Sequence, residues 1–327
     1  MSGLSWPETV AAVALADRLG YDTIWLSEAW GHEVFSRLAH LACHTQRIQL
    51  GCGIANVYSR SPALLAQSAA TVDLVSDKRL KLGLGTSGRR VVEGWHGVAF
   101  GDGLERLKET VEVIRLILAG QRLSYRGSVF QLDSGLKLLE PAPRKAVPIY
   151  LGTLTPGGLG LAGELADGWI SVFFSPLHFA DVIAPHLRRG ARSAGRELPR
   201  VCVFQPVIVT DDLARGRDRA RPGIALYVGG MGTREHNYYN RLFCAYGFEK
   251  EAREVQDHYL AGRRQEAVAA VTDQMVDLVT IVGSAATCRR RLEELGEAGV
   301  DEVALEIFAG SAPGGLSGWL EAMAPAA

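Results

Sequence analysis

Short apolar segments alternate with amphipathic helical segments along the whole chain, and this alternation constrains the fold more than any other feature. Expected strands cover 22–27, 47–54, 80–84, 148–151, 168–174, 201–209, 277–282 and 301–307. Expected helices cover 7–19, 33–44, 61–75, 104–119, 178–194 and 285–298. Strands that alternate with helices predict a parallel sheet whose faces are covered by helices.

The length of the chain favours one arrangement of such a sheet. At 327 residues, with a predicted hairpin within 121–146 and a helical excursion over 230–264, the pattern favours a closed (β/α)8 TIM barrel. An open Rossmann sheet would need GxGxxG after its first strand, and the sequence lacks it. No shift in composition marks a boundary, so we expect a single domain over residues 1–327.

Only seven of these segments make good barrel strands, because 277–282 is merely short and extended, so the pattern is one strand short of a (β/α)8 barrel. The usual first strand of a (β/α)8 barrel would precede the helix that begins at Pro7, where only Met1–Trp6 are available. These residues lack the alternation of a strand. We therefore expect a TIM barrel with insertions whose first strand is missing or truncated.

Composition excludes several classes of function. The formal net charge is −1, and no basic block suggests a nucleic acid or a membrane surface as a partner. The 5 cysteines are scattered and form no CxxC motif, which predicts reduced thiols in the cytoplasm. The histidines show neither HxxxH nor HExxH spacing, so we expect no bound metal.

The segment Leu80–Gly88 is the first candidate for a ligand site. Leu80, Leu82 and Leu84 alternate with other residues as in a strand, and the segment then becomes a run of small residues. Glycines let backbone N–H groups turn toward a ligand, and two hydroxyls add donors. A loop at the carboxyl end of a parallel strand is a common cofactor site, although a plain strand-to-helix turn has the same sequence pattern.

Several ordered segments together resemble the luciferase-like monooxygenase superfamily, in particular its branch that depends on coenzyme F420, a deazaflavin. Within that branch, the chain is most similar to methylenetetrahydromethanopterin reductase. The resemblance spans nearly the whole chain and is carried by Gly20–Trp30, Leu50–Pro62, Leu82–Gly88, Val91–Gly97, Pro148–Gly152, Gly163–Trp169 and Val282–Gly283.

The resemblance implies a barrel that holds the cofactor at the mouth formed by the carboxyl ends of its strands. Members of the family often carry a non-prolyl cis peptide in a bulge against which the deazaflavin rests. The matching bond here is Gly53–Ile54. The family also implies a homodimer or larger homo-oligomer, and a small-molecule substrate.

The same resemblance implies which loops hold the cofactor. A wall of the site corresponds to Gly85, Thr86, Ser87 and Gly88. The loop and helix N-terminus that hold a phosphate correspond to Gly152, Thr153, Thr155, Gly157 and Gly158. A helix N-terminus suits this role because its free N–H groups and positive partial charge attract anions.

Glu28 is the candidate catalytic residue, since it ends a strand at the expected mouth where relatives place an acidic residue. Many relatives have a histidine next, where this chain has Ala29, so no catalytic histidine is implied here. The methylene reductases also carry a carboxylate on the first strand, which this chain lacks. Alternatively, Glu28 is a carboxylate that only bonds backbone at a strand end.

These features predict an oxidoreductase that transfers a hydride between coenzyme F420 and a small organic substrate. One alternative is an FMN-dependent monooxygenase of the same superfamily, and another is a non-catalytic, cofactor-binding homologue. Two further features remain open. The run at 236–240 suits a substrate lid or an oligomer contact, and Trp95 with His96 suits the mouth or simple packing.

Overall fold

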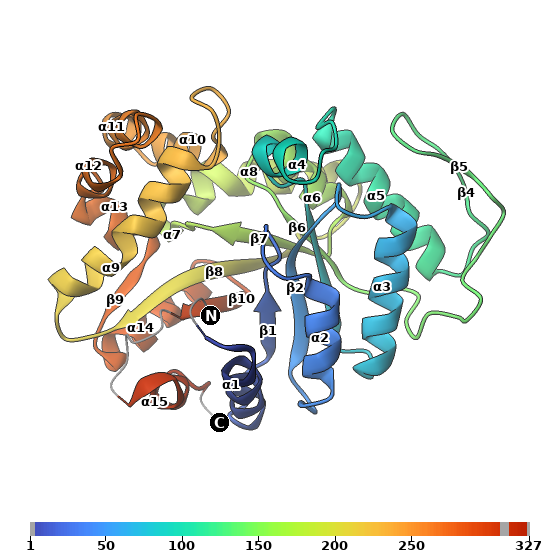
Figure 1. The fold of residues 1–327 in the computed structure, drawn as a ribbon, viewed down its shortest axis with the longest axis horizontal. Coiled ribbons are helices and arrows are strands. Elements are labelled where there is room, and N and C mark those ends of the chain that lie inside the picture. Colours follow the sequence, from blue (N-terminus) through green and yellow to red (C-terminus); the bar gives the residue numbers. More distant parts are fainter. Residues whose placement is uncertain (1–3, 308–313, 326–327) are drawn as a thin grey trace.

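The computed structural model describes residues 4–307 and 314–325. Its main sheet is parallel, with strands in the order β1, β2, β3, β6, β7, β8 and β10, and β9 pairs with the carboxyl end of β8 (Figure 1). The sheet curls until β10 lies near β1, which confirms the predicted barrel architecture. The strands are β1 (Thr23–Leu26), β2 (Gln49–Asn56), β3 (Leu80–Gly85), β6 (Ile149–Gly152), β7 (Gly168–Val172), β8 (Arg200–Val209), β9 (Ile281–Gly283) and β10 (Glu302–Ile307).

The barrel is open along one line. Among the described residues, no strand precedes α1 (Trp6–Arg18), and no hydrogen-bonded ladder joins β1 to β10. We call this opening between 23–26 and 302–307 the β1–β10 seam. The helix α1 begins with a capping box, because Ser5 accepts from the Glu8 amide while the Glu8 carboxylate accepts from the Ser5 amide.

Helices cover the outside of the barrel. No helix in the described parts of the chain combines the length and the apolar character that a membrane crossing needs. A small hairpin, β4 (Ser124–Arg126) with β5 (Gln131–Asp133), projects from one side (Figure 1). The helices after α1 are α2 (Val34–Ala42), α3 (Pro62–Val75), α4 (Arg89–Gly94), α5 (Gly103–Leu118), α6 (Pro156–Leu165), α7 (Pro176–His178), η1 (Phe179–Ile183), α8 (Ala184–Ser193), α9 (Leu213–Ala225), α14 (Ala285–Glu297) and α15 (Gly315–Ala322).

The predicted excursion over 230–264 is helical, as expected, and the helices gather beside α9 (Figure 1). It follows η2, a π-helical turn that continues directly from α9. The elements are η2 (Leu226–Gly230), α10 (Tyr238–Ala245), α11 (Glu249–Leu260), α12 (Arg264–Ala269) and α13 (Asp273–Val279).

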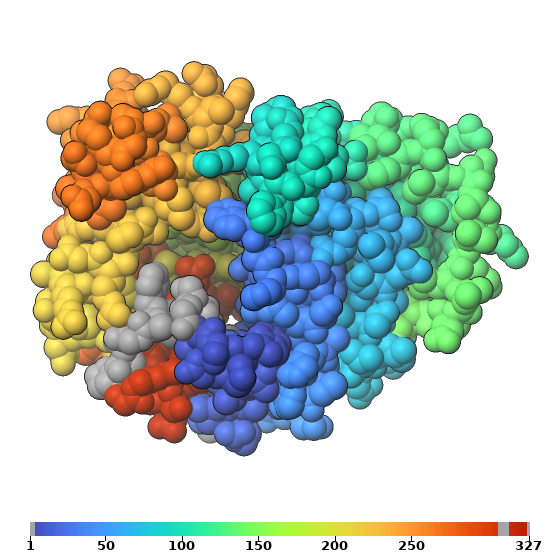
Figure 2. All heavy atoms as spheres, viewed as in Figure 1, coloured from blue at the N-terminus to red at the C-terminus, as the bar shows by residue number. Residues whose placement is uncertain are grey.

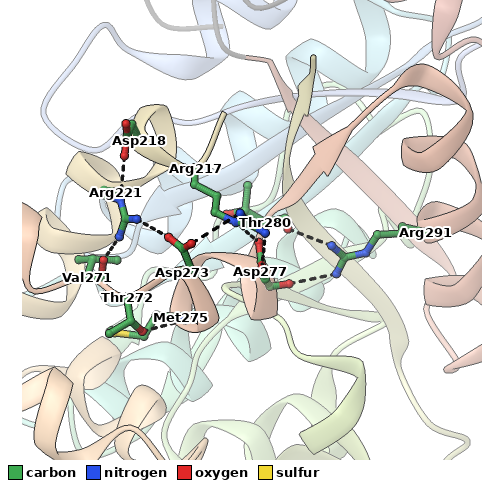
Figure 3. Close-up of polar contacts among 10 residues, drawn as sticks. All are labelled: Arg217, Asp218, Arg221, Val271, Thr272, Asp273, Met275, Asp277, Thr280 and Arg291. Atoms are coloured by element: carbon green, nitrogen blue, oxygen red, sulfur yellow. Dashed lines mark hydrogen bonds and ion pairs between the residues drawn. The ribbon is translucent and has the colours of Figure 1, made fainter. Parts of the chain in front are cut away.

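The prediction of an extended segment over 277–282 was wrong in its first half. Residues up to Val279 belong to α13, and only Ile281–Gly283 form a strand. Thr272 caps this helix by accepting a hydrogen bond from the Met275 amide, and Arg217 holds Asp277 through paired bonds of 2.8 Å (Figure 3). These contacts outweigh the strand propensity of a short apolar run.

A polar cluster fills the amino end of the barrel interior. The Lys81 ammonium donates to Glu302 and to Thr23, each at 2.7 Å, and the Trp25 indole donates to Glu302 at 2.7 Å. Above it lies an apolar layer that includes Tyr150 and other inward side chains. This filling leaves the opposite, carboxyl end of the barrel as the place for a cavity.

Candidate active site

A cavity of about 560 Å³ opens at the carboxyl ends of the strands, and residues from β1, β2, β6, β7, β8 and β10 line it. The cavity continues through the β1–β10 seam to α1 and α15. Figure 2 shows the molecular surface hollowed between the blue N-terminal part and the yellow and red C-terminal part. Of the predicted site residues, those that line the cavity are Gly53, Ile54, Thr86, Ser87, Gly88, Gly152, Thr153 and Thr155.

Ile54 forms an apolar wall of this cavity. The Gly53–Ile54 peptide bond is cis, and the β2–β3 register shifts between Cys52 and Ala55, so the predicted bulge and its cis bond are both confirmed. A Cβ on Gly152 would lie 2.8 Å from Ile54 Cγ2, and one on Gly85 would lie 3.0 Å from Ile54 Cδ1. Glycine at 152 is therefore required for the observed position of Ile54, and Gly85 packs tightly against the same side chain.

The loop after β3 brings hydroxyl groups to the cavity. Thr86 and Ser87 line it, and Ser87 adopts a left-handed conformation with φ of 58°. Gly88 precedes α4 with no side-chain cap on that helix. The loop thus exposes polar groups beside the Ile54 wall, as a cofactor site requires.

The loop after β6 leads directly into α6. The Thr155 hydroxyl caps this helix by accepting from the Gly158 amide at 3.1 Å, and Pro156 has no N–H group. Among the first residues of the helix, the Gly157 amide therefore stays available to an anion. A Cβ on Gly158 would lie 1.8 Å from the Thr153 hydroxyl, so Gly158 lies directly behind the two lining threonines.

Glu28 faces a neighbouring arginine. Its carboxylate accepts from both terminal nitrogens of Arg60, at 2.5 and 2.9 Å, and Arg60 also pairs with Glu33 at 2.9 Å. The flanking Ser27 and Ala29 line the cavity, whereas Glu28 is not among the lining residues that the structure describes. The Glu28 carboxylate is thus bonded to a side chain. This differs from the alternative considered from the sequence, in which it bonds only to backbone groups.

Aromatic side chains cover the cavity on the side of the helical excursion. Tyr227, Tyr238 and Tyr239 line it, and Phe173 packs edge-on against Tyr227 and Tyr239 at centroid distances of 5.2 and 6.0 Å. Burial raises the pKa of the Tyr227 and Tyr239 hydroxyls, so both stay neutral and can donate a hydrogen bond at physiological pH. Two residues of the run at 236–240 thus belong to the mouth of this same chain.

Neither residue of the Trp95–His96 pair lines the cavity; Trp95 is exposed, and the His96 Nε2 atom is buried without a hydrogen-bond partner.

Several lining residues were missed by sequence reasoning. Glu306, on β10, and Trp319, on α15, both line the cavity. Trp319 is 1% exposed, and its indole N–H has no hydrogen-bond partner. The alternation over 301–307 could have marked Glu306 as sharing a face with Glu302, but no local signal marks Trp319.

The fold and the cavity define a luciferase-like TIM-barrel protein, and comparison with known families agrees. Residues 1–302 match the family model described as luciferase-like monooxygenase. The chain belongs to this family, as the ordered motifs in its sequence predicted.

Similar proteins are named for coenzyme F420 or for tetrahydromethanopterin reduction. A Mycobacterium tuberculosis protein named "Putative coenzyme F420-dependent oxidoreductase" is 34% identical over 316 residues, covering 92% of this chain and 90% of its own. The 5,10-methylenetetrahydromethanopterin reductase of Archaeoglobus fulgidus is 30% identical over 294 residues, covering 89% and 86%. The F420-dependent tetrahydromethanopterin reductase structure from Methanopyrus kandleri superimposes with a TM-score of 0.82 at 22% identity, covering 98% and 94%.

Proposed function

We propose that this chain is a coenzyme F420-dependent oxidoreductase that transfers a hydride between F420 and a small organic substrate held in the cavity. The observation that carries the proposal is the Ile54 wall, which faces a cavity of about 560 Å³ in a chain similar to F420-dependent relatives over most of its length. When bound, F420 supplies or accepts the hydride at its C5 carbon.

The residues at the mouth suit a flat ring with an anionic tail. Gly85 and Gly152 leave Ile54 free to present an apolar face, because a Cβ at Gly152 would force Ile54 to shift and one at Gly85 would crowd it. Thr86 and Ser87 offer hydroxyl donors, and the α6 N-terminus offers the Gly157 amide to a phosphate. We assign the ring to the Ile54 wall and the phosphate to α6.

Reduction of a methylene-tetrahydromethanopterin is the finer form of this proposal, supported by the likeness to the Archaeoglobus fulgidus reductase. Glu28 stays a predicted catalytic residue. Its bonds to Arg60 also suit a positioning role, since they hold the strand end from which Ser27 and Ala29 reach the cavity. The homo-oligomer implied by the resemblance stays a prediction as well.

Fluorescence titration of the purified chain with F420 and, separately, with FMN tests the proposal. We expect tight binding of F420 and weak binding of FMN. The reverse result would favour the FMN-dependent monooxygenase, and binding of neither by a folded protein would favour the non-catalytic homologue.

A charge placed at the α6 N-terminus tests the phosphate assignment. Gly157→Asp adds a negative charge where a Cβ meets only the flexible end of Leu104, at 3.1 Å. We expect the Kd for F420 to rise at least about tenfold, because the new carboxylate repels the phosphate. Gly160→Asp is the matched control, since a Cβ there meets nothing within 4 Å. Equal affinity of both variants would refute the assignment.

A further inference from the structure

Glu306 is the one charged side chain among the described residues that line the cavity. The other lining residues are apolar, aromatic, small or neutral polar, with no lysine, arginine, histidine or aspartate among them. The described lining residues therefore offer Glu306 no opposite charge of the kind that a structural ion pair would need.

The register of β10 turns Glu306 toward the barrel interior. Glu302 points inward, because it bonds to Lys81 and Trp25 inside the barrel. Side chains alternate along a strand, so Glu306 lies on the same face, near the carboxyl end where the cavity is. Glu306 pairs with Pro206 of β8, and Ala304 pairs with Phe204. Glu306 therefore lies two residues closer to the carboxyl end of the sheet than the position of Phe204.

The Glu306 carboxyl group is not engaged by the residues that the structure describes. Glu306 makes no hydrogen bond or ion pair with any residue that the structure describes, and its side chain is exposed to the cavity. The titratable groups that line the cavity with it are tyrosines, namely Tyr21 between α1 and β1, Tyr227 on η2, and Tyr238 and Tyr239 on α10. No described residue therefore competes with a ligand for the Glu306 carboxyl group.

The surroundings favour a carboxyl group that can hold a proton. Burial among protein atoms raises the pKa of Glu306 above its ordinary value. The negative charge of Glu306 in turn adds to the burial that raises the pKa of Tyr227, so the two groups sense each other across the cavity. A raised pKa brings a carboxyl group closer to the range in which it exchanges protons at physiological pH.

We propose that Glu306 is a catalytic residue that exchanges the proton accompanying hydride transfer, directly with the oxygen or nitrogen bonded to the reacting carbon of the substrate. This inference rests on the proposed function. The reacting end of the substrate that it implies is an uncharged carbonyl–alcohol or imine–amine group. An anionic group placed beside Glu306 would be repelled by the carboxylate and would find no cation among the described lining residues.

The step balances in both directions. In reduction, the carbonyl carbon gains a hydride, the π electron pair moves to its oxygen, and the Glu306 O–H proton passes to that oxygen. Glu306 is left as a carboxylate and recovers its proton from water. In oxidation, the Glu306 carboxylate takes the hydroxyl proton as the carbon–hydrogen bond breaks and the hydride leaves for the cofactor.

Glu306→Gln tests the proposal, because it keeps the shape and removes the acid. Reduced F420 is mixed with acetone, cyclohexanone or the imine of cyclohexanone, and the rate of substrate reduction is measured at several pH values. The affinity for F420 is measured separately by fluorescence. We expect kcat to fall by about 10²–10⁴-fold, with KM and the Kd of F420 nearly unchanged. The wild-type rate should fall as pH rises through the pKa of Glu306, and the variant should lose that limb.

Glu293→Gln is the matched control, since Glu293 is exposed on α14. Turnover of Glu306→Gln at the wild-type rate, with the wild-type pH profile, would overturn the proposal. A wild-type chain that binds F420 but reduces none of the probes would count against the proposed function instead.

In that case, infrared titration of the F420-bound protein decides. A carboxyl band that Glu306→Gln removes, and that protonates above the ordinary range of glutamate, supports the proposal. The lack of such a band, or titration in the ordinary range, overturns it.

Discussion

Glu302 and Glu306 lie on the same face of the same strand, yet they occupy opposite ends of the barrel. Glu302, at the amino end, is bonded to both Lys81 and Trp25 at 2.7 Å. Glu306, at the carboxyl end, has no such partner among the described residues and faces the cavity. The contrast teaches that partners decide the use of a carboxylate inside the barrel. A carboxylate bonded to an ammonium stabilises the fold, whereas one without such a bond stays available for chemistry.

The largest expected effect comes from removing the compensated carboxylate. Glu302→Leu leaves the Lys81 side chain, which is only 15% exposed, without its counter-ion, so we expect a loss of about 3–5 kcal/mol in the free energy of unfolding. Urea denaturation measures it, and Lys81→Met added to Glu302→Leu should recover part of the loss. A loss below about 1 kcal/mol would show that the pair is not a structural unit.

Substituting a glycine that packs against the Ile54 wall should have a smaller effect on stability. Gly152→Ala places a Cβ 2.8 Å from Ile54 Cγ2, and we expect about 1–3 kcal/mol of destabilisation together with weaker F420 binding. Gly160→Ala, in the open middle of α6, should instead stabilise by up to about 1 kcal/mol. If both variants behaved alike, the close approach at Ile54 would not be what requires glycine.

The ion pairs that tie α9 to α13 should contribute less again (Figure 3). Asp277→Asn weakens the paired bonds from Arg217, and about 0.5–1 kcal/mol of stability should be lost because these side chains remain partly open to water. The loss should shrink in high salt. A salt-independent loss would indicate that packing, and not charge, holds α13 in place.

The smallest expected effect is the contribution of Glu306 to the pH dependence of stability. A carboxyl whose pKa is raised in the folded state favours folding when protonated, and this contribution is lost as pH rises through the raised pKa. Thermal melts should therefore find Glu306→Gln more stable than the wild type at neutral pH, and the difference should vanish at acidic pH. A constant difference at all pH values would deny that Glu306 titrates with a raised pKa.

Much of the barrel could be predicted from the sequence, because buried parallel strands and amphipathic helices leave strong local patterns. The bulge at Gly53–Ile54 and the lining role of Thr86 and Ser87 were foreseen from ordered motifs. The segment over 277–282 was not, because a short apolar run suits both a strand and a helix. Its helix depends on a cap at Thr272 and on contacts with Arg217 from another element.

The most informative site residues escaped prediction because their roles depend on distant neighbours. Glu306 differs from Glu302 only in what surrounds it, and the sequence records neither Lys81 nor the cavity as its neighbour. Tyr227 reaches the mouth through η2, whose course depends on tertiary packing. Tyr239 lies within the run at 236–240, for which the sequence left a lid and an oligomer contact both open. Glu28 shows the opposite case. The sequence singled it out by its position at a strand end, yet its carboxylate is bonded to Arg60 and does not line the cavity that the structure describes.

The β1–β10 seam gives the barrel a mechanical property that a fully laddered barrel lacks. Elsewhere in the main sheet, adjacent strands are tied by backbone hydrogen bonds, so widening the wall would break them. At the seam, the curvature of the sheet can change while every ladder stays intact. The barrel wall should therefore widen at the seam at little cost in energy and admit ligands of different bulk. Backbone amide protons of β1 and β10 along the seam should exchange with solvent before those of the other strands.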